Sequence, residues 1–218
     1  MPVQAVIFDL DGVLVDSEQV WDAVREEYTR EAGGTWRPGA TRAMMGMSSR
    51  EWSGYMHDEL GVPAEPERIS TAVAGRVEDR YRARLPLLPG AQAAVRRLAA
   101  RWRLAIASSS NRPVIELVLE LSALGERIAV VVSSEEVAHG KPAPDVYLTA
   151  AARLGVPAAS CAAVEDSTNG LRAAHAAGMR VIAVPNRTFP PEPEALASAD
   201  VVLESLERLG PGDVDPTL

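Results

Sequence analysis

The chain has 218 residues, of which 47% are hydrophobic and 24% are charged, and its formal net charge is −8. This length allows one large domain or a core with a smaller insertion. The negative charge argues against a general nucleic-acid or anionic-membrane surface. The one cysteine, Cys161, excludes an internal disulfide, and no apolar run reaches the ~18 residues of a membrane span. We therefore expect a monomeric, cytoplasmic protein that binds neither nucleic acid nor membrane.

The N-terminal segment is an apolar run that ends in two acids. Residues 3–8 are almost all apolar and predict a buried strand, and Asp9, Asp11 and Gly12 follow it. Open α/β sheets bind their ligands at the carboxyl ends of the strands. Because buried carboxylates are costly without a partner, this segment predicts a bound cation at that end of the sheet.

From residue 87 onward, predicted strands alternate with predicted helices. The strands are expected at residues 103–107, 128–132, 161–164 and 180–184, with an edge strand at 200–203. The helices are expected at residues 91–101, 113–124, 144–154 and 168–177, followed by a frayed tail at 210–218. Alternation of this kind implies parallel strands with right-handed crossovers. The sequence therefore predicts an α/β fold with a doubly wound parallel sheet.

The segment after the first strand has a different pattern. It contains no convincing strand and predicts helices at residues 17–31, 49–60 and 66–84, separated by prolines and glycines. An all-helical block at this position is most simply a second, smaller domain. We therefore assign residues 1–15 and 87–218 to an α/β core and residues 16–86 to a helical cap that can hinge over the sheet edge.

Acidic, basic and hydroxyl side chains follow the ends of four predicted strands. These residues are Asp9, Asp11, Ser108, Lys141, Glu165 and Asp166. Lys141 is the only lysine among the 22 basic residues of the chain. Parallel topology brings all four strand ends to one edge of the sheet, so the residues are expected to form a single site.

This set of residues suits phosphoryl transfer, in which the protein mainly positions groups and neutralises charge. Asp9 and Asp166 can supply the carboxylates that Mg²⁺ prefers beside water and phosphate oxygens. One carboxylate can attack phosphorus, and a second acid two residues further on can protonate the leaving oxygen and then activate water. Lys141 can cancel charge, while Ser108 and nearby amides can bind phosphate oxygens.

Four motifs occur in the order of a known family. The segment DLDGVLVDS beginning at Asp9 resembles the first motif of the haloacid dehalogenase-like hydrolases. Ser108, GKPAPD beginning at Gly140 and EDSTNG beginning at Glu165 resemble the second, third and fourth motifs. The match spans about residues 3–209, and it is most similar to the branch of β-phosphoglucomutase-like and phosphoglycolate-phosphatase-like proteins with a helical cap.

The resemblance implies a role for each matched residue. Asp9 would be the nucleophile, and Asp11 would be the general acid and base and a Mg²⁺ ligand through its carbonyl. Asp166 would be a metal ligand, whereas Glu165 is a ligand in some members and lies outside the ligand set in others. Lys141 and Ser108 would complete the catalytic set. Dehalogenases of this fold lack the second aspartate, so Asp11 argues against the reaction that gave the family its name.

Substrate binding is expected from the motif loops and from the cap. Beside the carboxylates, the expected substrate-binding residues are Gly12, Ser109, Ser110 and Asn111. Because the core chemistry is generic, the cap should choose the substrate, and its candidates are Arg50, for a second anionic group, Trp21 and Trp52. β-Phosphoglucomutases have a histidine at the position that corresponds to Trp21, and tryptophan cannot carry protons, which favours hydrolysis over isomerisation.

We expect a Mg²⁺-dependent phosphatase of small phosphorylated metabolites, such as sugar phosphates, that works through an aspartyl phosphate. One alternative is a phosphosugar mutase, which returns the phosphoryl group to the sugar. Another alternative is a non-enzymatic phospho-acceptor module. Receiver domains of that kind also combine acids, an aspartate and a lysine, but their phosphorylated aspartate follows the third strand and they have no helical insertion.

Overall fold

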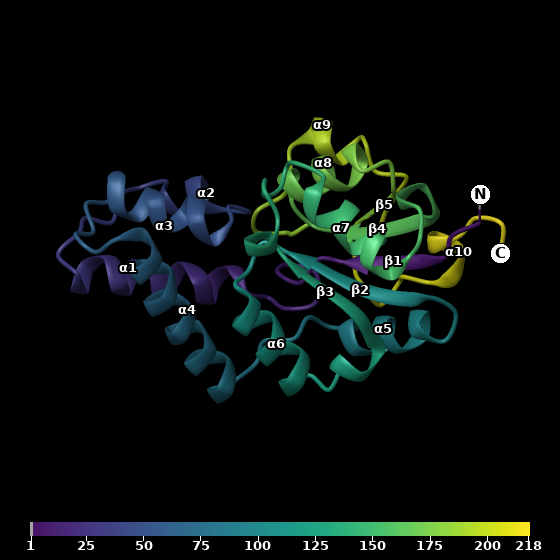
Figure 1. Cartoon of the computed structure of the whole chain (residues 1–218), viewed down its shortest axis with the longest axis horizontal. Coiled ribbons are helices and arrows are strands. Elements are labelled where there is room, and N and C mark those ends of the chain that lie inside the picture. The colour runs from purple at the N-terminus through teal and green to yellow at the C-terminus, as the bar shows by residue number, and fades with distance from the viewer. Residues whose placement is uncertain (1) are drawn as a thin grey trace.

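The larger part of the molecule is built around one parallel β-sheet (Figure 1). The computed structural model describes residues 2–218. The strand order is β3-β2-β1-β4-β5-β6, and every neighbouring pair is parallel. The strands are β1 (Ala5–Phe8), β2 (Arg103–Ser108), β3 (Ile128–Ser133), β4 (Cys161–Glu165), β5 (Arg180–Ala183) and β6 (Val201–Val202). This order runs outward in both directions from β1, so the predicted doubly wound α/β fold is confirmed.

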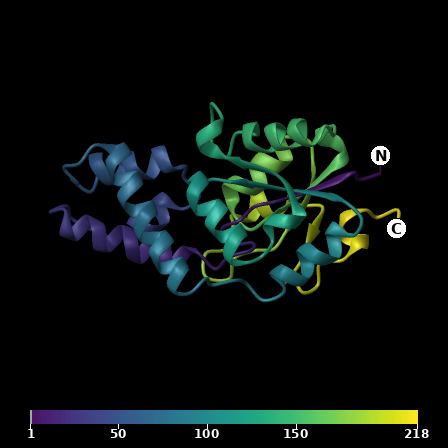
Figure 2. The same cartoon turned by 60° about the horizontal axis from the view of Figure 1, so that its bottom comes forward.

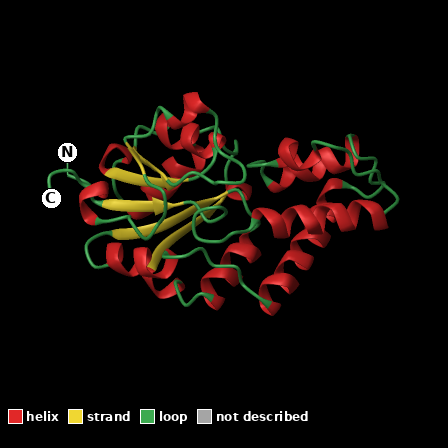
Figure 3. Cartoon of the chain, turned by 180° about the vertical axis from the view of Figure 1, so that it is seen from behind, coloured by secondary structure: helices red, strands yellow, loops and turns green. Residues whose placement is uncertain are grey.

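Helices cover both faces of the sheet (Figure 3). Helices α5 (Ala91–Ala99) and α6 (Arg112–Leu121) pack on one face, and α7 (Asp145–Leu154) and α8 (Thr168–Ala176) pack on the other. The remaining short elements of the core are η1 (Gly125–Arg127), η2 (Ser134–Glu136), η3 (Ala158–Ser160), α9 (Pro193–Leu196) and α10 (Pro211–Val214).

The position of β1 at the centre of the sheet explains why its sequence is apolar throughout. Val6 and Phe8 belong to the core cluster beneath α5 and α6, whereas Ala5 and Ile7 belong to the cluster beneath α7 and α8. All four side chains are fully buried. A strand covered on both faces needs apolar residues at every position, and this is the pattern that predicted it.

Four helices between β1 and α5 form the smaller part of the molecule (Figure 2). They are α1 (Glu18–Glu31), α2 (Ala40–Met44), α3 (Ser49–Asp58) and α4 (Pro66–Ala83). The predicted helical cap is therefore confirmed. Its interior includes the fully buried Met56 and Val73. Within residues 2–218, no helix combines the length and apolar character needed to cross a membrane.

The two connections between cap and core run side by side. Val15 and Leu87 form an isolated antiparallel bridge, and the amide of Asp16 donates to the carbonyl of Pro86 at 2.8 Å. The amide of Leu88 also donates to the carbonyl of Leu14 at 3.0 Å. The paired connections coincide with the domain boundaries predicted near residues 16 and 86, which remain a prediction.

Three sequence expectations differ from the structure. The helix expected at 113–124 ends at Leu121, because Ala123 adopts a left-handed conformation with φ of 55° and turns the chain before Gly125. Helix α2 was not predicted. The expected frayed tail is wrong, since Val214 is fully buried and Asp215 accepts a hydrogen bond from the amide of Val3 at 3.1 Å.

The central position of Phe8 gives a stability prediction. Phe8→Ala should lower the free energy of unfolding by about 3–5 kcal/mol, because the cavity would open in a core covered on both sides. Val202→Ala is the matched control, since Val202 is 52% exposed on the edge strand and should change stability by less than about 0.5 kcal/mol. Denaturant unfolding measures both values, and similar losses in the two variants would contradict this view of the core.

Candidate active site

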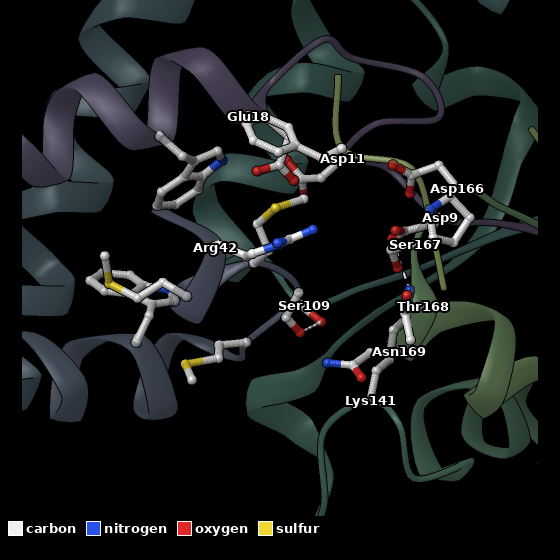
Figure 4. Close-up of a pocket in the computed structure, with 18 of the residues that line it drawn as sticks. Asp9, Asp11, Glu18, Arg42, Ser109, Lys141, Asp166, Ser167, Thr168 and Asn169 are labelled. Carbon is white, nitrogen blue, oxygen red and sulfur yellow. Dashed lines mark hydrogen bonds and ion pairs between the residues drawn. The ribbon is translucent and has the colours of Figure 1, made fainter. Parts of the chain in front are cut away.

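A cavity of about 690 Å³ lies between the cap and the carboxyl ends of the strands (Figure 4). This volume is within the range of small-molecule sites. The core lines it with residues that include Asp9, Asp11, Ser109, Ser110, Lys141 and Asp166. The cap lines it with residues that include Glu18, Trp21, Arg25, Arg42 and Trp52. Acidic, basic and hydroxyl residues that are far apart in the sequence therefore lie together around this cavity.

Three buried acids form a cluster at the floor of this site. Oxygens of Asp9, Glu165 and Asp166 lie within 4.8 Å of one another. Asp9 is 6% exposed, Asp166 is 3% exposed and Glu165 is fully buried. Burial, reinforced by the neighbouring carboxylates, raises the pKa of Asp9 and of Asp166 well above the usual value. The cluster therefore holds more negative charge than its surroundings neutralise, and it fits a bound cation.

Lys141 supplies the positive charge within the cluster. Its Nζ lies 2.6 Å from Glu165 Oε1 and 3.0 Å from Asp9 Oδ1. Burial lowers the pKa of Lys141, but the carboxylates of Asp9 and Glu165 outweigh it and raise the pKa above the usual value. Lys141 therefore stays protonated beside Asp9 (Figure 4).

Both oxygens of Glu165 already have donors. Oε1 accepts hydrogen bonds from Lys141 Nζ and from the Tyr147 hydroxyl at 2.8 Å. Oε2 accepts from the amides of Asp166 and Ser167 at 3.0 and 3.2 Å. The sequence left Glu165 either inside or outside a metal ligand set. Its full complement of donors favours the second role, in which it positions Lys141 and the loop that carries Asp166.

Gly12 allows the first and fourth motifs to come together. Its φ is +74°, and a Cβ atom at this position would lie 2.0 Å from Asp166 Oδ2. A side chain here would therefore displace the Asp166 carboxylate. In the structure Gly12 gives Asp166 room beside the loop of Asp11, and its predicted part in substrate binding stays a prediction.

Asp11 is held by the serines that follow β2. Its Oδ2 accepts hydrogen bonds from Ser110 Oγ at 2.7 Å and from Ser108 Oγ at 3.2 Å. Ser108 is fully buried, and its Oγ also accepts from the amide of Ser110 at 3.0 Å. Ser108 was predicted to bind phosphate oxygens, which stays a prediction, and in the structure its hydroxyl donates to Asp11. Ser109 and Ser110 line the cavity, as expected.

Three predicted substrate-binding residues, Gly12, Asn111 and Arg50, are not among the described residues that line the cavity. Asn111 Nδ2 donates to Ser70 Oγ at 3.1 Å and to Glu135 Oε1 at 2.8 Å, so it ties the cap to the core. Arg50 is exposed. Helix α3 turns Ser49 and Trp52 inward, which leaves the side chain of Arg50 facing solvent.

The cap brings two predicted residues and several unpredicted ones to the cavity. Trp21 and Trp52 line it, as expected, and so do Glu18, Arg25 and Arg42, which were not predicted from the sequence. Arg25 follows Trp21 by four residues on α1, so the two share one helix face. That spacing was the available signal. For Glu18, burial and then the nearby Asp11 carboxylate raise the pKa to about 7.

A family model decides the family of this chain. The model of the haloacid dehalogenase-like hydrolases matches residues 3–178, which is well over half of the chain. The chain belongs to this hydrolase family. The resemblance expected from the four motifs is therefore confirmed, and so is the expectation of a hydrolase.

Individual relatives agree with this assignment. Hexitol phosphatase B of Escherichia coli is 34% identical over 97% of this chain and 96% of its own length. The structure of CbbY from Rhodobacter sphaeroides in complex with phosphate is 27% identical, with a TM-score of 0.86 over 97% of this chain and 99% of that chain. β-Phosphoglucomutase of Clostridium difficile has a TM-score of 0.81 at 20% identity, over 95% and 93% of the two chains, and shares the fold.

The contact between Gly12 and Asp166 gives the first prediction for the site. We expect Mg²⁺ to raise the melting temperature of the wild type, and Gly12→Ala should abolish this rise, because the new methyl group displaces a carboxylate of the acidic cluster. Gly61→Ala is the matched control, since Gly61 has a φ of +71° and a Cβ atom there would meet no other atom within 4 Å. Both variants should lose about 1 kcal/mol from backbone strain, but only Gly61→Ala should keep the Mg²⁺ response.

The raised pKa of Glu18 gives a second prediction for the site. Between the usual value near 4.5 and the folded value of about 7, the folded state keeps a proton that the unfolded state has lost. Stability should therefore fall as the pH rises through this window. Glu18→Gln should be more stable than the wild type at pH 8, by on the order of 1 kcal/mol, and similar to it near pH 4.5.

Thermal unfolding across this pH range measures the effect of Glu18→Gln. Glu26→Gln is the control, because Glu26 lies on the same helix but its side chain pairs with Arg30 outside the cavity lining. It should retain the pH dependence of the wild type. A constant difference between Glu18→Gln and the wild type at all pH values would contradict the prediction.

Proposed function

We propose that this protein is a Mg²⁺-dependent phosphatase that hydrolyses small phosphate monoesters, such as sugar phosphates, through an aspartyl phosphate. The observation that carries the proposal is the pairing of two differently held carboxylates. Asp9 is buried beside protonated Lys141, whereas Asp11 faces the cavity on two serine hydroxyls. One carboxylate is thus set for attack and the other for proton transfer.

The acidic cluster fits the metal that this chemistry requires. Oδ1 of Asp166 is buried and has no hydrogen-bond partner among the described residues, and the buried Oδ1 of Asp9 has none besides its ion pair with Lys141. The available donors are all oxygens, which Mg²⁺ prefers. We propose that Asp9, Asp166 and the Asp11 carbonyl would hold Mg²⁺, with Glu165 outside the ligand set. When bound, the ion supplies positive charge against the phosphate oxygens.

In the first step, a carboxylate oxygen of Asp9 attacks phosphorus and forms an O–P bond. The bond from phosphorus to the alcohol oxygen breaks, and Asp11 donates its proton to that oxygen. Lys141 neutralises charge between Asp9 and the transferred group. Ser109 and Ser110, which line the cavity, are placed to bind the phosphate oxygens.

In the second step, Asp11 accepts a proton from a water molecule as the water attacks phosphorus. The bond between phosphorus and Asp9 breaks, which releases inorganic phosphate and restores the Asp9 carboxylate. Asp11 ends the cycle with the proton that it needs for the next substrate. The hydrogen bonds from Ser108 and Ser110 hold Asp11 in one orientation for both transfers.

Hydrolysis is favoured over the mutase alternative by the composition of the cavity. Within residues 2–218, its lining includes no histidine, and Trp21 stands on the cap side where it cannot carry a proton. The name of hexitol phosphatase B supports a phosphorylated polyol or sugar as the substrate class. CbbY, in a complex with xylulose 1,5-bisphosphate, supports the same class. We also propose a monomer that works in the cytoplasm.

The direct test is the release of phosphate from p-nitrophenyl phosphate and from a panel of sugar phosphates. The wild type should release phosphate with Mg²⁺ and lose activity when the metal is chelated. Asp9→Asn should reduce kcat by at least about a thousandfold, because the amide is a poor nucleophile. Activity of Asp9→Asn near that of the wild type would sink the mechanism. Conversion of β-glucose 1-phosphate to glucose 6-phosphate without release of phosphate would favour the mutase.

A further inference from the structure

Arg25 is a buried cation in the cap wall of the cavity. It lies on α1 and is 8% exposed. Its guanidinium carbon is 5.1 Å from the ring centroid of Trp21 and 4.9 Å from that of Trp52. The two rings are 5.9 Å apart at 58°. Helices α1 and α3 thus contribute one ring each to a fixed aromatic seat for the guanidinium.

The guanidinium forms no direct ion pair within the part of the chain that the structure describes, and the carboxylates of Glu18, Asp11 and Asp22 favour its charge only from a longer distance. Among residues 2–218, no carboxylate lies within the 4.0 Å of an ion pair, and the Arg25 guanidinium donates no hydrogen bond. Its Nε is buried without any partner. Burial lowers the pKa of Arg25 to about 10, so the side chain is still a cation at neutral pH.

Aromatic contacts alone do not satisfy this group. The rings attract the positive charge, but they do not accept the directed N–H bonds of a guanidinium, and a buried cation is costly unless it is paired and hydrogen-bonded. The planar fork of arginine suits carboxylate and phosphate groups, which it binds with two parallel hydrogen bonds. The unpartnered Arg25 therefore indicates an anionic ligand rather than a purely structural role.

The position of Arg25 says which part of a ligand it would meet. Arg25 lines the same cavity as Asp9, Lys141 and Asp166, but it comes from the cap, whereas they come from the strand ends. Arg42 also reaches into this cavity from the cap (Figure 4). A phosphate held at Asp9 would thus leave the far end of the same molecule facing the cap arginine.

We propose that Arg25 binds a second anionic group, a carboxylate or a phosphate, at the end of the substrate opposite the phosphate that is cleaved. This assignment rests on the proposed phosphatase function and narrows its substrates to phosphorylated sugars or acids with a charged tail. It also moves the role predicted for Arg50 to a residue that the cavity contains.

Three compounds separate the possibilities. Glucose 6-phosphate has a neutral tail, 6-phosphogluconate has a carboxylate tail, and fructose 1,6-bisphosphate has a phosphate tail. For each, KM is measured by release of phosphate, or the inhibition constant against p-nitrophenyl phosphate where the compound is not turned over. The wild type should bind at least one charged-tail compound about tenfold more tightly than glucose 6-phosphate, and the better of the two identifies the anion.

Arg25→Gln should raise the KM or inhibition constant of the preferred charged-tail compound about tenfold. The same substitution should change the KM or inhibition constant of glucose 6-phosphate less than about twofold. Arg25→Lys should keep part of the preference, since it retains the charge. Arg30→Gln is the control, because Arg30 lies on the same helix, pairs with Glu26 and is outside the cavity lining, and it should change none of these constants. If Arg25→Gln does not fold, the preference of the wild type and its reduction in Arg25→Lys decide the matter.

Two results would overturn the assignment. One is a wild type that binds the neutral and charged tails equally, and the other is an Arg25 variant that weakens all three compounds to the same extent, as a packing defect would. The phosphatase proposal fails separately, by the absence of turnover of p-nitrophenyl phosphate. Turnover without any preference for a charged tail contradicts the role of Arg25 alone.

Discussion

The buried pairing of Lys141 with Asp9 and Glu165 is the interaction on which the site depends. One ammonium group faces two carboxylates at 3.0 and 2.6 Å, in a place where water contributes little. Glu165 fixes the lysine because its own oxygens are saturated by donors. Asp9 Oδ1 has no partner among the described residues besides Lys141, and Asp9 lines the cavity. The negative charge that Lys141 does not neutralise favours the binding of a cation, which in turn favours the binding of a phosphate.

The core and the cap contribute different parts of the site. The sheet delivers the reacting carboxylates because β1 and β4 are adjacent and parallel, so that their loops meet. Gly12 then allows that meeting at close range. The cap supplies the other wall, with an arginine seated on two tryptophans. Chemistry common to the family thus stays in the core, while the cap presents the group that distinguishes substrates.

A feature could be predicted from the sequence when the residues that determine it are neighbours in the chain, and could not when it depends on contacts between distant segments. Strand β1 and the strand-end acids were predictable, because an apolar run and the residues after it are contiguous. Helix α2 has only five residues and gives little periodicity. The ordered tail depends on the contact of Asp215 with Val3, at the other end of the chain. Arg25 was missed because its seat needs Trp52 from a different helix, whereas Arg50 lacked any inward-facing partner.

The central claim is that Asp9 carries the phosphoryl group during turnover. The most direct measurement is acid quenching of the Asp11→Asn variant with p-nitrophenyl phosphate, whose leaving group needs little protonation, followed by mass spectrometry of the peptides. Because this variant lacks the base for the second step, we predict a burst of p-nitrophenol and one phosphoryl group on the peptide that contains Asp9. A phosphoryl group on another residue, or turnover without any covalent phosphoenzyme, would contradict the account.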